Sequence, residues 1–165
     1  MKQQTNILER LSAPIESIRW RVQSQKGKWA ICVPYIDSRD AQKRLDDVMG
    51  VNWQSEHFDL GGRLYCKIGL CIEGSWIWRS DVGTESNIEG TKGEASDSFK
   101  RAAVQWGVGR FLYDIAPMKL PLVDYNGKKY PLYDIGGKSG PCLNGETLTR
   151  YINTKRSNDE SGKKL

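Results

Sequence analysis

Two adjacent cations, Lys100 and Arg101, lie in the middle of a segment, Asp97–Gly107, whose pattern predicts an amphipathic helix. The large and small apolar residues of this segment recur at helical spacing and share one face: Phe99, Ala102, Ala103 and Trp106. A helix that buries such a stripe presents the two cations at fixed positions beside it, which suits the binding of a phosphate backbone. A solvated charge pair on an ordinary surface helix explains this segment alone equally well.

Residue patterns that support hydrolytic chemistry are incomplete in this chain. The run Gly136–Ser139 resembles the end of a phosphate loop, but Leu132 stands where that loop requires a glycine. No Asp or Glu is followed two residues later by Lys, which is the spacing that metal-dependent nucleases usually have. Asp81, Glu85 and Glu89 recur every four residues, but the glycines around them predict a loop with solvated carboxylates.

The histidine and cysteine content also argues against an enzyme. His57 is the only histidine, and nothing in the sequence supplies it with a partner for acid–base or nucleophilic catalysis. The cysteines lack the CxxC spacing of structural zinc sites, and a chain with this much apolar content does not need disulfides. Buried reduced thiols are therefore expected at Cys32, Cys66, Cys71 and Cys142. We expect no catalytic residue, no metal and no cofactor.

The elements that must position Lys100 and Arg101 follow from periodicity and turn residues, which predict an α+β chain. The expected helices cover residues 6–11, from Asp37 or Ser38 to Met49, 94–112 and 145–153. The expected strands cover residues 18–23, 29–33, 53–60, 63–73 and 75–82. The last three strands are separated by short glycine-containing turns, so they predict an antiparallel meander.

Length and composition predict one main domain with additions at its carboxyl end. Residues 1–115 are expected to form the core domain, including a short N-terminal helix. Residues 116–154 form a Pro/Gly-rich extension, most of it a loop as far as about Pro141. Charged and small polar residues (Lys, Arg, Ser, Asn, Asp, Glu and Gly) dominate residues 155–165, so a basic disordered tail is expected.

The chain carries a net charge of +5, unevenly distributed. Counting Lys and Arg against Asp and Glu gives +3 for residues 1–50, −3 for residues 51–91 and +5 for residues 92–165. A nucleic-acid surface is therefore expected on the two flanks rather than on the strand-rich middle. The chain has no apolar run long enough for a membrane span and no apolar signal region, so we expect a cytoplasmic protein.

Four short blocks resemble, in order and in spacing, the motifs of the Rad-fifty-two superfamily of single-strand DNA annealing proteins, especially its compact phage and bacterial members. They are Tyr35–Asp40 with the helix to Gly50 and then Asn52–Trp53, Asp81–Gly83, Glu89–Lys92, and the Asp97–Gly107 helix. Each block is weak alone, and the ordered set is the specific signal. The resemblance covers roughly residues 15–115.

The resemblance implies a strand–helix–antiparallel β-meander–helix core that assembles into rings or helical oligomers. It further implies ATP-independent binding of single-stranded DNA in an outer groove and annealing of complementary strands in recombination and double-strand break repair. The partners would be single-stranded DNA, other copies of the chain, and an exonuclease or a single-strand-binding protein. Two alternatives stay open: a non-annealing binder of single-stranded or double-stranded RNA, and a metal-dependent nuclease.

The resemblance also assigns site residues. Lys100 and Arg101 match the pair that lines the inner DNA groove, and Lys92 matches a lysine of a second, outer site. Asp40 stands where eukaryotic members have a groove arginine, and we expect Arg39, one position earlier, to serve instead. If the groove contacts only phosphates, most of the tryptophans are packing groups. Trp106 is expected in the core, and Trp76 and Trp78, on one strand face, either in a core or in a subunit interface.

Overall fold

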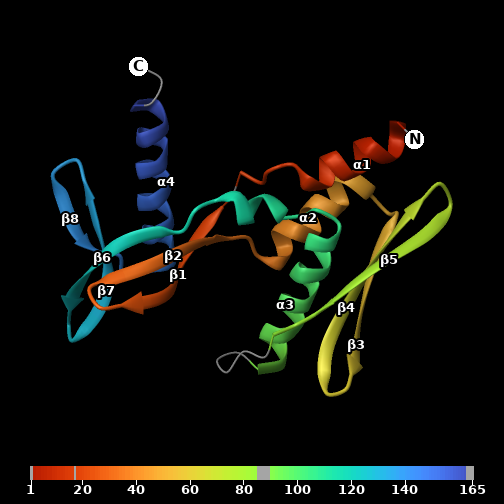
Figure 1. Ribbon diagram of the computed structural model, residues 1–165, viewed down its shortest axis with the longest axis horizontal. Helices are drawn as coiled ribbons and strands as arrows, with labels where there is room; N and C mark the ends of the chain where they lie inside the picture. Colours follow the sequence, from red (N-terminus) through yellow and green to blue (C-terminus); the bar gives the residue numbers. More distant parts are fainter. Residues whose placement is uncertain (1, 17, 85–89, 163–165) are drawn as a thin grey trace. The chain divides into compact units, whose positions relative to one another are not determined.

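The computed structural model describes the backbone of residues 2–16, 18–84 and 90–162, and the side chains of 6–16, 18–84 and 93–159. The chain divides into two compact units. Unit 1 consists of residues 1–17 and 36–114, and unit 2 consists of residues 18–35 and 115–165. Figure 1 shows the elements of both units in sequence colours.

Unit 1 contains an antiparallel meander of three strands, in the spatial order β3–β4–β5. The strands are β3 (Trp53–Leu60), β4 (Arg63–Ile72) and β5 (Ser75–Val82), as their alternation predicts. Gly61 and Gly62 connect the first pair and Glu73 and Gly74 the second, and all four residues have positive φ. Two-residue turns of this kind match the twist of the strands that they join.

Three helices complete unit 1: α1 (Lys2–Ser12), α2 (Ser38–Met49) and α3 (Gly90–Gln105). The apolar face of β4, with Cys66, Ile68 and Leu70, is fully buried and packs against α3. The expected helix over 94–112 is corrected at its end, because Gly107 and Gly109 take φ of 99° and 79°. A 3₁₀ segment, Arg110–Asp114, follows instead.

The second helix begins and ends at the predicted residues. Asp37 is the N-cap: its carboxylate accepts hydrogen bonds from the backbone N–H groups of Arg39 and Asp40, at 2.9 Å and 3.0 Å. Asp40 in turn accepts from the backbone N–H of Asp37 at 2.9 Å, which completes a capping box. Gly50, with φ of 57°, ends the helix.

Unit 2 is a five-stranded antiparallel sheet in the order β1–β2–β6–β7–β8. The strands are β1 (Arg19–Lys26), β2 (Trp29–Tyr35), β6 (Met118–Tyr125), β7 (Lys128–Ile135) and β8 (Lys138–Pro141). Helix α4 (Gly145–Gly162) packs on one face of this sheet. Trp20 in β1 is fully buried there, and its indole donates a hydrogen bond to Asn153 of α4 at 3.0 Å.

Two expectations for the carboxyl-terminal part are wrong. The segment expected to be a loop as far as Pro141 forms the three strands β6, β7 and β8. The segment expected to be disordered after Lys155 continues the helix α4 to Gly162, and residues 163–165 lie outside the described part. The expected α+β class and the strand–helix–meander–helix order of the core are confirmed. Among the described residues, no helix has the length and apolar character needed to cross a bilayer.

Candidate nucleic-acid interface

Helix α3 presents Lys100 and Arg101 on different sides, because neighbouring helical residues point about 100° apart. The Arg101 side chain is 43% exposed and faces β5, where its Nε lies 3.4 Å from Oδ1 of Asp81. Lys100 is half-buried. In the described part of the chain, no hydrogen bond or ion pair engages the Lys100 ammonium. The two cations are therefore not equivalent: one is held by a carboxylate, and the other is available to an anion.

The Asp81 carboxylate is held by three groups. Burial alone would raise its pKa, but hydrogen bonds from Gln105 and from the backbone of Val82, together with the charge of Arg101, outweigh burial and leave the pKa below its usual range. The sequence places Asp81 near the end of the expected strand 75–82 but predicts a solvated carboxylate, whereas the carboxylate contacts α3. Its register opposite Cys66, on the apolar side of the sheet, is the signal that it faces α3.

The contact between α2 and α3 brings the predicted Arg39 to the same part of unit 1 as Lys100. The Ser38 hydroxyl in α2 hydrogen-bonds the Ser96 hydroxyl in α3. Arg39 is the next residue after Ser38, and Lys100 lies one turn after Ser96 on the same helix face. Arg39 is exposed. Arg39 and Lys100 thus belong to the two helices that this contact joins.

Asp40 and Lys92 are the two remaining positions that the resemblance singled out. The Asp40 carboxylate is engaged in the capping box of α2, so its role in the structure is to stabilise the helix start. Lys92 belongs to the first turn of α3, and its side chain lies outside the described residues. Asp97 is also structural, because it accepts hydrogen bonds from the backbone and the hydroxyl of Thr84 at 2.9 Å and 2.8 Å.

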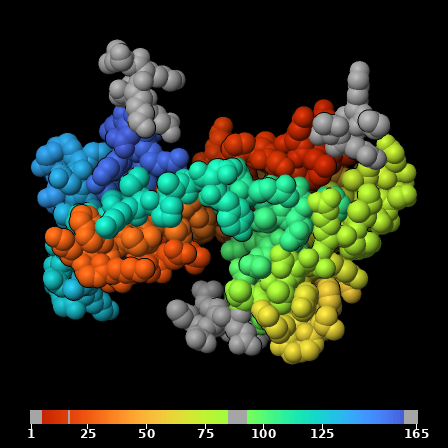
Figure 2. Space-filling view, in the orientation of Figure 1, coloured from red at the N-terminus to blue at the C-terminus, as the bar shows by residue number. Residues whose placement is uncertain are grey.

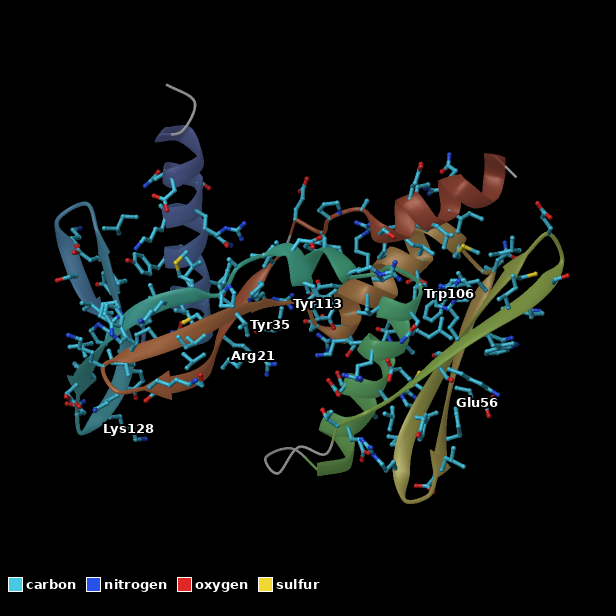
Figure 3. The ribbon with its side chains drawn as sticks, in the orientation of Figure 1. Arg21, Tyr35, Glu56, Trp106, Tyr113 and Lys128 are labelled. Atoms are coloured by element: carbon cyan, nitrogen blue, oxygen red, sulfur yellow. The ribbon has the colours of Figure 1, made fainter. Side chains whose placement is uncertain are left out.

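The apolar face of α3 is buried as predicted. Its members are Phe99, Ala102, Ala103 and Trp106. The Trp106 indole donates a hydrogen bond to the backbone carbonyl of Ile68 at 3.0 Å, and the Arg79 guanidinium lies 4.2 Å from the ring centroid. Figure 3 shows Trp106 between α3 and the sheet of unit 1. Trp106 is thus a packing residue with no ring face free to stack on a base.

The opposite face of the β3–β4–β5 sheet carries Trp76 and Trp78. Their rings stack with centroids 6.0 Å apart, and they are 44% and 41% exposed. Lys67 lies 5.0 Å from the Trp78 ring centroid and pairs with Glu56 at 2.9 Å. Of the two roles open to these tryptophans, a core position within this chain is excluded. A role in a subunit interface stays a prediction.

The groups considered for catalysis do not converge in the described residues. His57 Nε2 lies 3.1 Å from the backbone carbonyl of Ala95, and the carboxylate of Asp81 is engaged with α3. Glu85 and Glu89 lie outside the described residues. Within the described part, no group of three His, Cys, Asp or Glu side chains is arranged to hold a metal ion.

All four cysteines are free thiols, as expected, and three of them are buried. Burial raises the pKa of Cys66 and of Cys142 to about 11. Burial, with a smaller effect from Cys142, raises the pKa of Cys32 to about 11. These three thiols are therefore protonated at neutral pH and poor nucleophiles.

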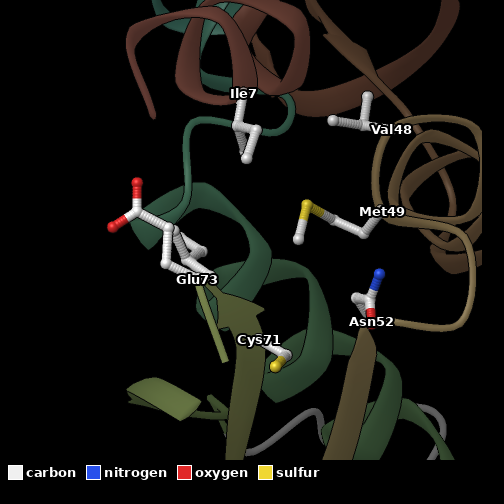
Figure 4. A pocket seen from close by; sticks show the side chains of 7 residues that line it. Ile7, Val48, Met49, Asn52, Cys71 and Glu73 are labelled. Atoms are coloured by element: carbon white, nitrogen blue, oxygen red, sulfur yellow. The ribbon is translucent and has the colours of Figure 1, made fainter. Parts of the chain in front are cut away.

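A cavity of about 300 Å³ opens between α1, α2 and the end of β4. Its lining combines apolar and polar groups: Ile7, Val48, Met49, Asn52, Cys71, Ile72 and Glu73. Figure 4 shows the Glu73 carboxylate directed away from the Ile7 and Met49 side chains. This lining offers no cation for a phosphate, so the cavity is not part of the candidate interface.

Two curated proteins that are similar to this chain are named single-stranded DNA-binding protein DdrA. The single-stranded DNA-binding protein DdrA of Deinococcus deserti is 32% identical over 117 residues, which are 67% of this chain and 58% of that protein. DdrA of Deinococcus radiodurans is 30% identical over 67% of this chain and 56% of its own length. The chain thus spans less than two thirds of these relatives.

No solved structure matches the chain at a significant level. The sequence model of the Rad52/22 family of double-strand break repair proteins matches residues 2–129, which include strands β1, β2 and β6 and all of unit 1 except Met1. The match extends further in both directions than the motif blocks, and it confirms the resemblance that those blocks indicated. On this evidence, the chain belongs to the Rad52/22 family of double-strand break repair proteins.

Proposed function

We propose that this protein binds the phosphate backbone of single-stranded DNA and anneals complementary strands without ATP, in recombination and double-strand break repair. The observation that carries the proposal is the set of cations that helices α2 and α3 of unit 1 carry. Lys100 has no partner among the described residues, and Arg39 is exposed. Arg101 forms an ion pair with Asp81 that is partly exposed to water. Family membership and the names of the two relatives support DNA as the anion.

The chemistry of annealing favours a grip on phosphate at this site. A protein that pairs two strands must leave the base edges accessible, and contacts to phosphate carry no sequence information. Lys100 and Arg101 are attached to a helix whose other face is buried, so their positions are fixed relative to the sheet. We further propose that the site repeats around a homo-oligomer, that Lys92 contributes to a second contact, and that the protein is not an enzyme.

Annealing and DNA affinity test the proposal. In the double variant Lys100→Gln/Arg101→Gln, two phosphate contacts are lost. The slope of log K against log salt should then decrease by about 0.7 for Lys100 and by up to about 0.7 more for Arg101, because a full single-strand contact contributes about 0.7 and Arg101 is paired with Asp81. Between 1 M and 0.1 M salt a full contact amounts to about fivefold in affinity, so the affinity at 0.1 M should decrease between about fivefold and about 25-fold.

The matched control is Lys43→Gln/Arg150→Gln, which removes the same charge. Both residues are exposed and pair within their own helices, Lys43 with Asp47 and Arg150 with Glu146. We expect the control to bind and anneal like the parent protein. Equal affinity of the two double variants would contradict the proposed site.

The alternatives are tested with the same preparations. Complementary oligonucleotides that pair no faster with protein than without it would exclude annealing. Tighter binding of RNA than of single-stranded DNA would favour the RNA-binding alternative. Magnesium-dependent loss of labelled DNA, abolished by Asp81→Asn, would favour the nuclease.

A further inference from the structure

The sheet of unit 2 has one face covered by α4 and one face that no helix of this unit covers (Figure 1). Alternate residues along the strands point to opposite faces. Trp20, Ala30, Cys32 and Leu120 point to the α4 side and are buried. Their neighbours in sequence therefore form the second surface, which we call the open face of unit 2.

The open face combines cations with aromatic rings. It carries Arg21 and Lys26 from β1, Trp29 and Tyr35 from β2, Lys119 from β6 and Lys128 from β7. The four cations are exposed and the two rings are half-buried. Figure 3 shows Arg21, Tyr35 and Lys128 on the side of the sheet away from α4, and Figure 2 shows β1 and β2, in orange, at the surface on that side.

Cations and rings of the open face are in direct contact. The Lys119 ammonium lies 4.7 Å from the centroid of the Trp29 ring, and the Arg21 guanidinium carbon lies 6.0 Å from that of Tyr35. These distances fall in the range of cation–π interactions. A nucleotide presents the complementary pair of groups, a flat base joined to an anionic phosphate, so each ring–cation pair matches one nucleotide.

The charge of the open face selects an anionic partner. Asp134, near the β7–β8 turn, is the one acidic residue of the described strands that the register places on this face. It lies beyond Leu132, at the end of the sheet away from the β1–β2 pair. A positively charged surface that tracks a backbone, with aromatic rings for the bases, is the arrangement that binds single-stranded nucleic acid.

We propose that the open face of unit 2 is a second binding surface for single-stranded DNA, in which bases stack on Trp29 and Tyr35 while Lys119 and Arg21 bind the flanking phosphates. The proposal rests on the proposed function for its choice of DNA, and it differs from the unit 1 site in contacting bases. Trp29 and Tyr35 are the two ends of β2, six residues and therefore about 20 Å apart, so several nucleotides separate the two stacking positions.

Binding measurements on the full-length chain separate the base contacts from the charge contacts. The ring variant is Trp29→Leu, and the charge variant is Arg21→Gln/Lys119→Gln. The matched control, Arg150→Gln/Lys138→Gln, removes the same charge from unit 2 outside the open face, on α4 and at the β7–β8 turn. Each variant is checked by circular dichroism, and the charge variant changes only exposed side chains.

The probes are oligo-dT and an abasic oligonucleotide of equal length. Trp29→Leu should weaken oligo-dT binding at least about fivefold and leave abasic binding unchanged, since loss of one stacked base has an effect of that size. Arg21→Gln/Lys119→Gln should weaken both probes and reduce the salt slope by about 1.4. Photocrosslinking of 5-iodouracil-substituted oligo-dT should label Trp29 or Tyr35, also in Lys100→Gln/Arg101→Gln.

The failure of this proposal is distinguishable from failure of the proposed function. If the ring and charge variants bind both probes like the control and no crosslink forms in residues 18–35, the open face is not a DNA surface, while annealing by the parent protein would still support the proposed function. An open face that instead serves an acidic protein partner would give that same negative result. Absence of any DNA binding by the parent protein would overturn both.

Discussion

Replacement of Asp81 by Asn should strengthen the binding of single-stranded DNA. Arg101 can bind a phosphate fully only when it leaves the Asp81 carboxylate, 3.4 Å from its Nε. The pair is partly exposed, at 43% for the Arg101 side chain and 20% for Asp81, so water screens much of its attraction. Such pairs contribute at most about 1 kcal/mol, which sets the expected gain in affinity at up to about fivefold.

The substitution preserves the shape of the side chain. An asparagine oxygen can take the place of Asp81 Oδ1, which accepts from the backbone N–H of Val82 at 2.8 Å. The asparagine NH2 group takes the place of Asp81 Oδ2, which accepts from the Gln105 amide at 3.0 Å, so this hydrogen bond is kept only if the Gln105 carboxamide turns to present its oxygen. The main electrostatic change is the loss of one negative charge beside Arg101. Because the released guanidinium then makes a full phosphate contact, the salt slope should become steeper by as much as about 0.7.

Fluorescence anisotropy with labelled oligo-dT between 50 and 200 mM salt, in the range where phosphate contacts dominate, measures the effect. A double-mutant cycle with Arg101→Gln identifies its origin. Asp81→Asn should have little effect in the Arg101→Gln background, where no guanidinium remains to be released. An equal gain in both backgrounds would mean that Asp81 acts only through its long-range field. No gain in either background would refute the assignment of Arg101 as a phosphate ligand.

The same carboxylate makes stability depend on pH. The pKa of Asp81 is lower in the folded chain than the value of about 3.9 typical of unfolded chains. A lowered pKa means that the unfolded state binds the proton more readily, so this group stabilises the fold above about pH 4 and loses that contribution as the pH falls through its folded pKa. The stability difference between the parent and Asp81→Asn, measured by urea unfolding, should therefore be largest near neutral pH and shrink below pH 4.

Two further substitutions separate structural from binding residues. Asp40→Ala should lower the free energy of unfolding in urea by about 1 kcal/mol, because it removes one half of the α2 capping box. DNA affinity should stay unchanged or increase. A loss of affinity as large as that of Arg39→Gln would contradict the structural role of Asp40. Trp106→Phe should cost about 2 kcal/mol or more, because the buried carbonyl of Ile68 loses its hydrogen-bond donor and the ring leaves a gap. Unchanged stability combined with weaker DNA binding would instead make Trp106 a DNA contact.

The parts of the fold that the sequence predicts well are those encoded by neighbouring residues. Helix α2 has its N-cap at Asp37 and its stop at Gly50, and both signals are local. Strands β3 and β5 have the predicted bounds because the turns at 61–62 and 73–74 fix the ends of the hairpins. Each of these features depends on contacts between residues close in sequence.

The carboxyl-terminal strands were missed because prolines argue against strands. Pro121, Pro131 and Pro141 each occupy the last register position of a strand ladder, opposite Trp29, Leu122 and Leu132 respectively. At the end of a ladder the missing N–H costs no internal hydrogen bond. Asn126–Gly127, with positive φ at both residues, is a strong hairpin signal that outweighs the nearby prolines.

The partition into two units depends on pairings between residues far apart in sequence. Strand β2 pairs with β6, so that Ala30 lies opposite Leu120. No periodic pattern within either strand encodes that pairing. The same limitation applies to the candidate site. Helical periodicity predicts that Lys100 and Arg101 diverge, but only the tertiary contacts of α3 with β5 and α2 distinguish the paired cation from the available one.

The two proposed DNA surfaces would impose different constraints on a bound strand, and both are compatible with annealing. At the proposed unit 1 site the cations would contact phosphates and leave every part of the base free. Deep base pockets would hide the edges that must pair, which is why the sequence argued against tryptophans as base contacts. An open sheet face avoids this conflict, because a base that stacks on Trp29 or Tyr35 uses its ring face and keeps its hydrogen-bonding edge in the plane of the ring. Those edges then stay accessible to a second strand, and a Trp29→Leu protein should anneal more slowly only to the extent that it binds DNA less tightly.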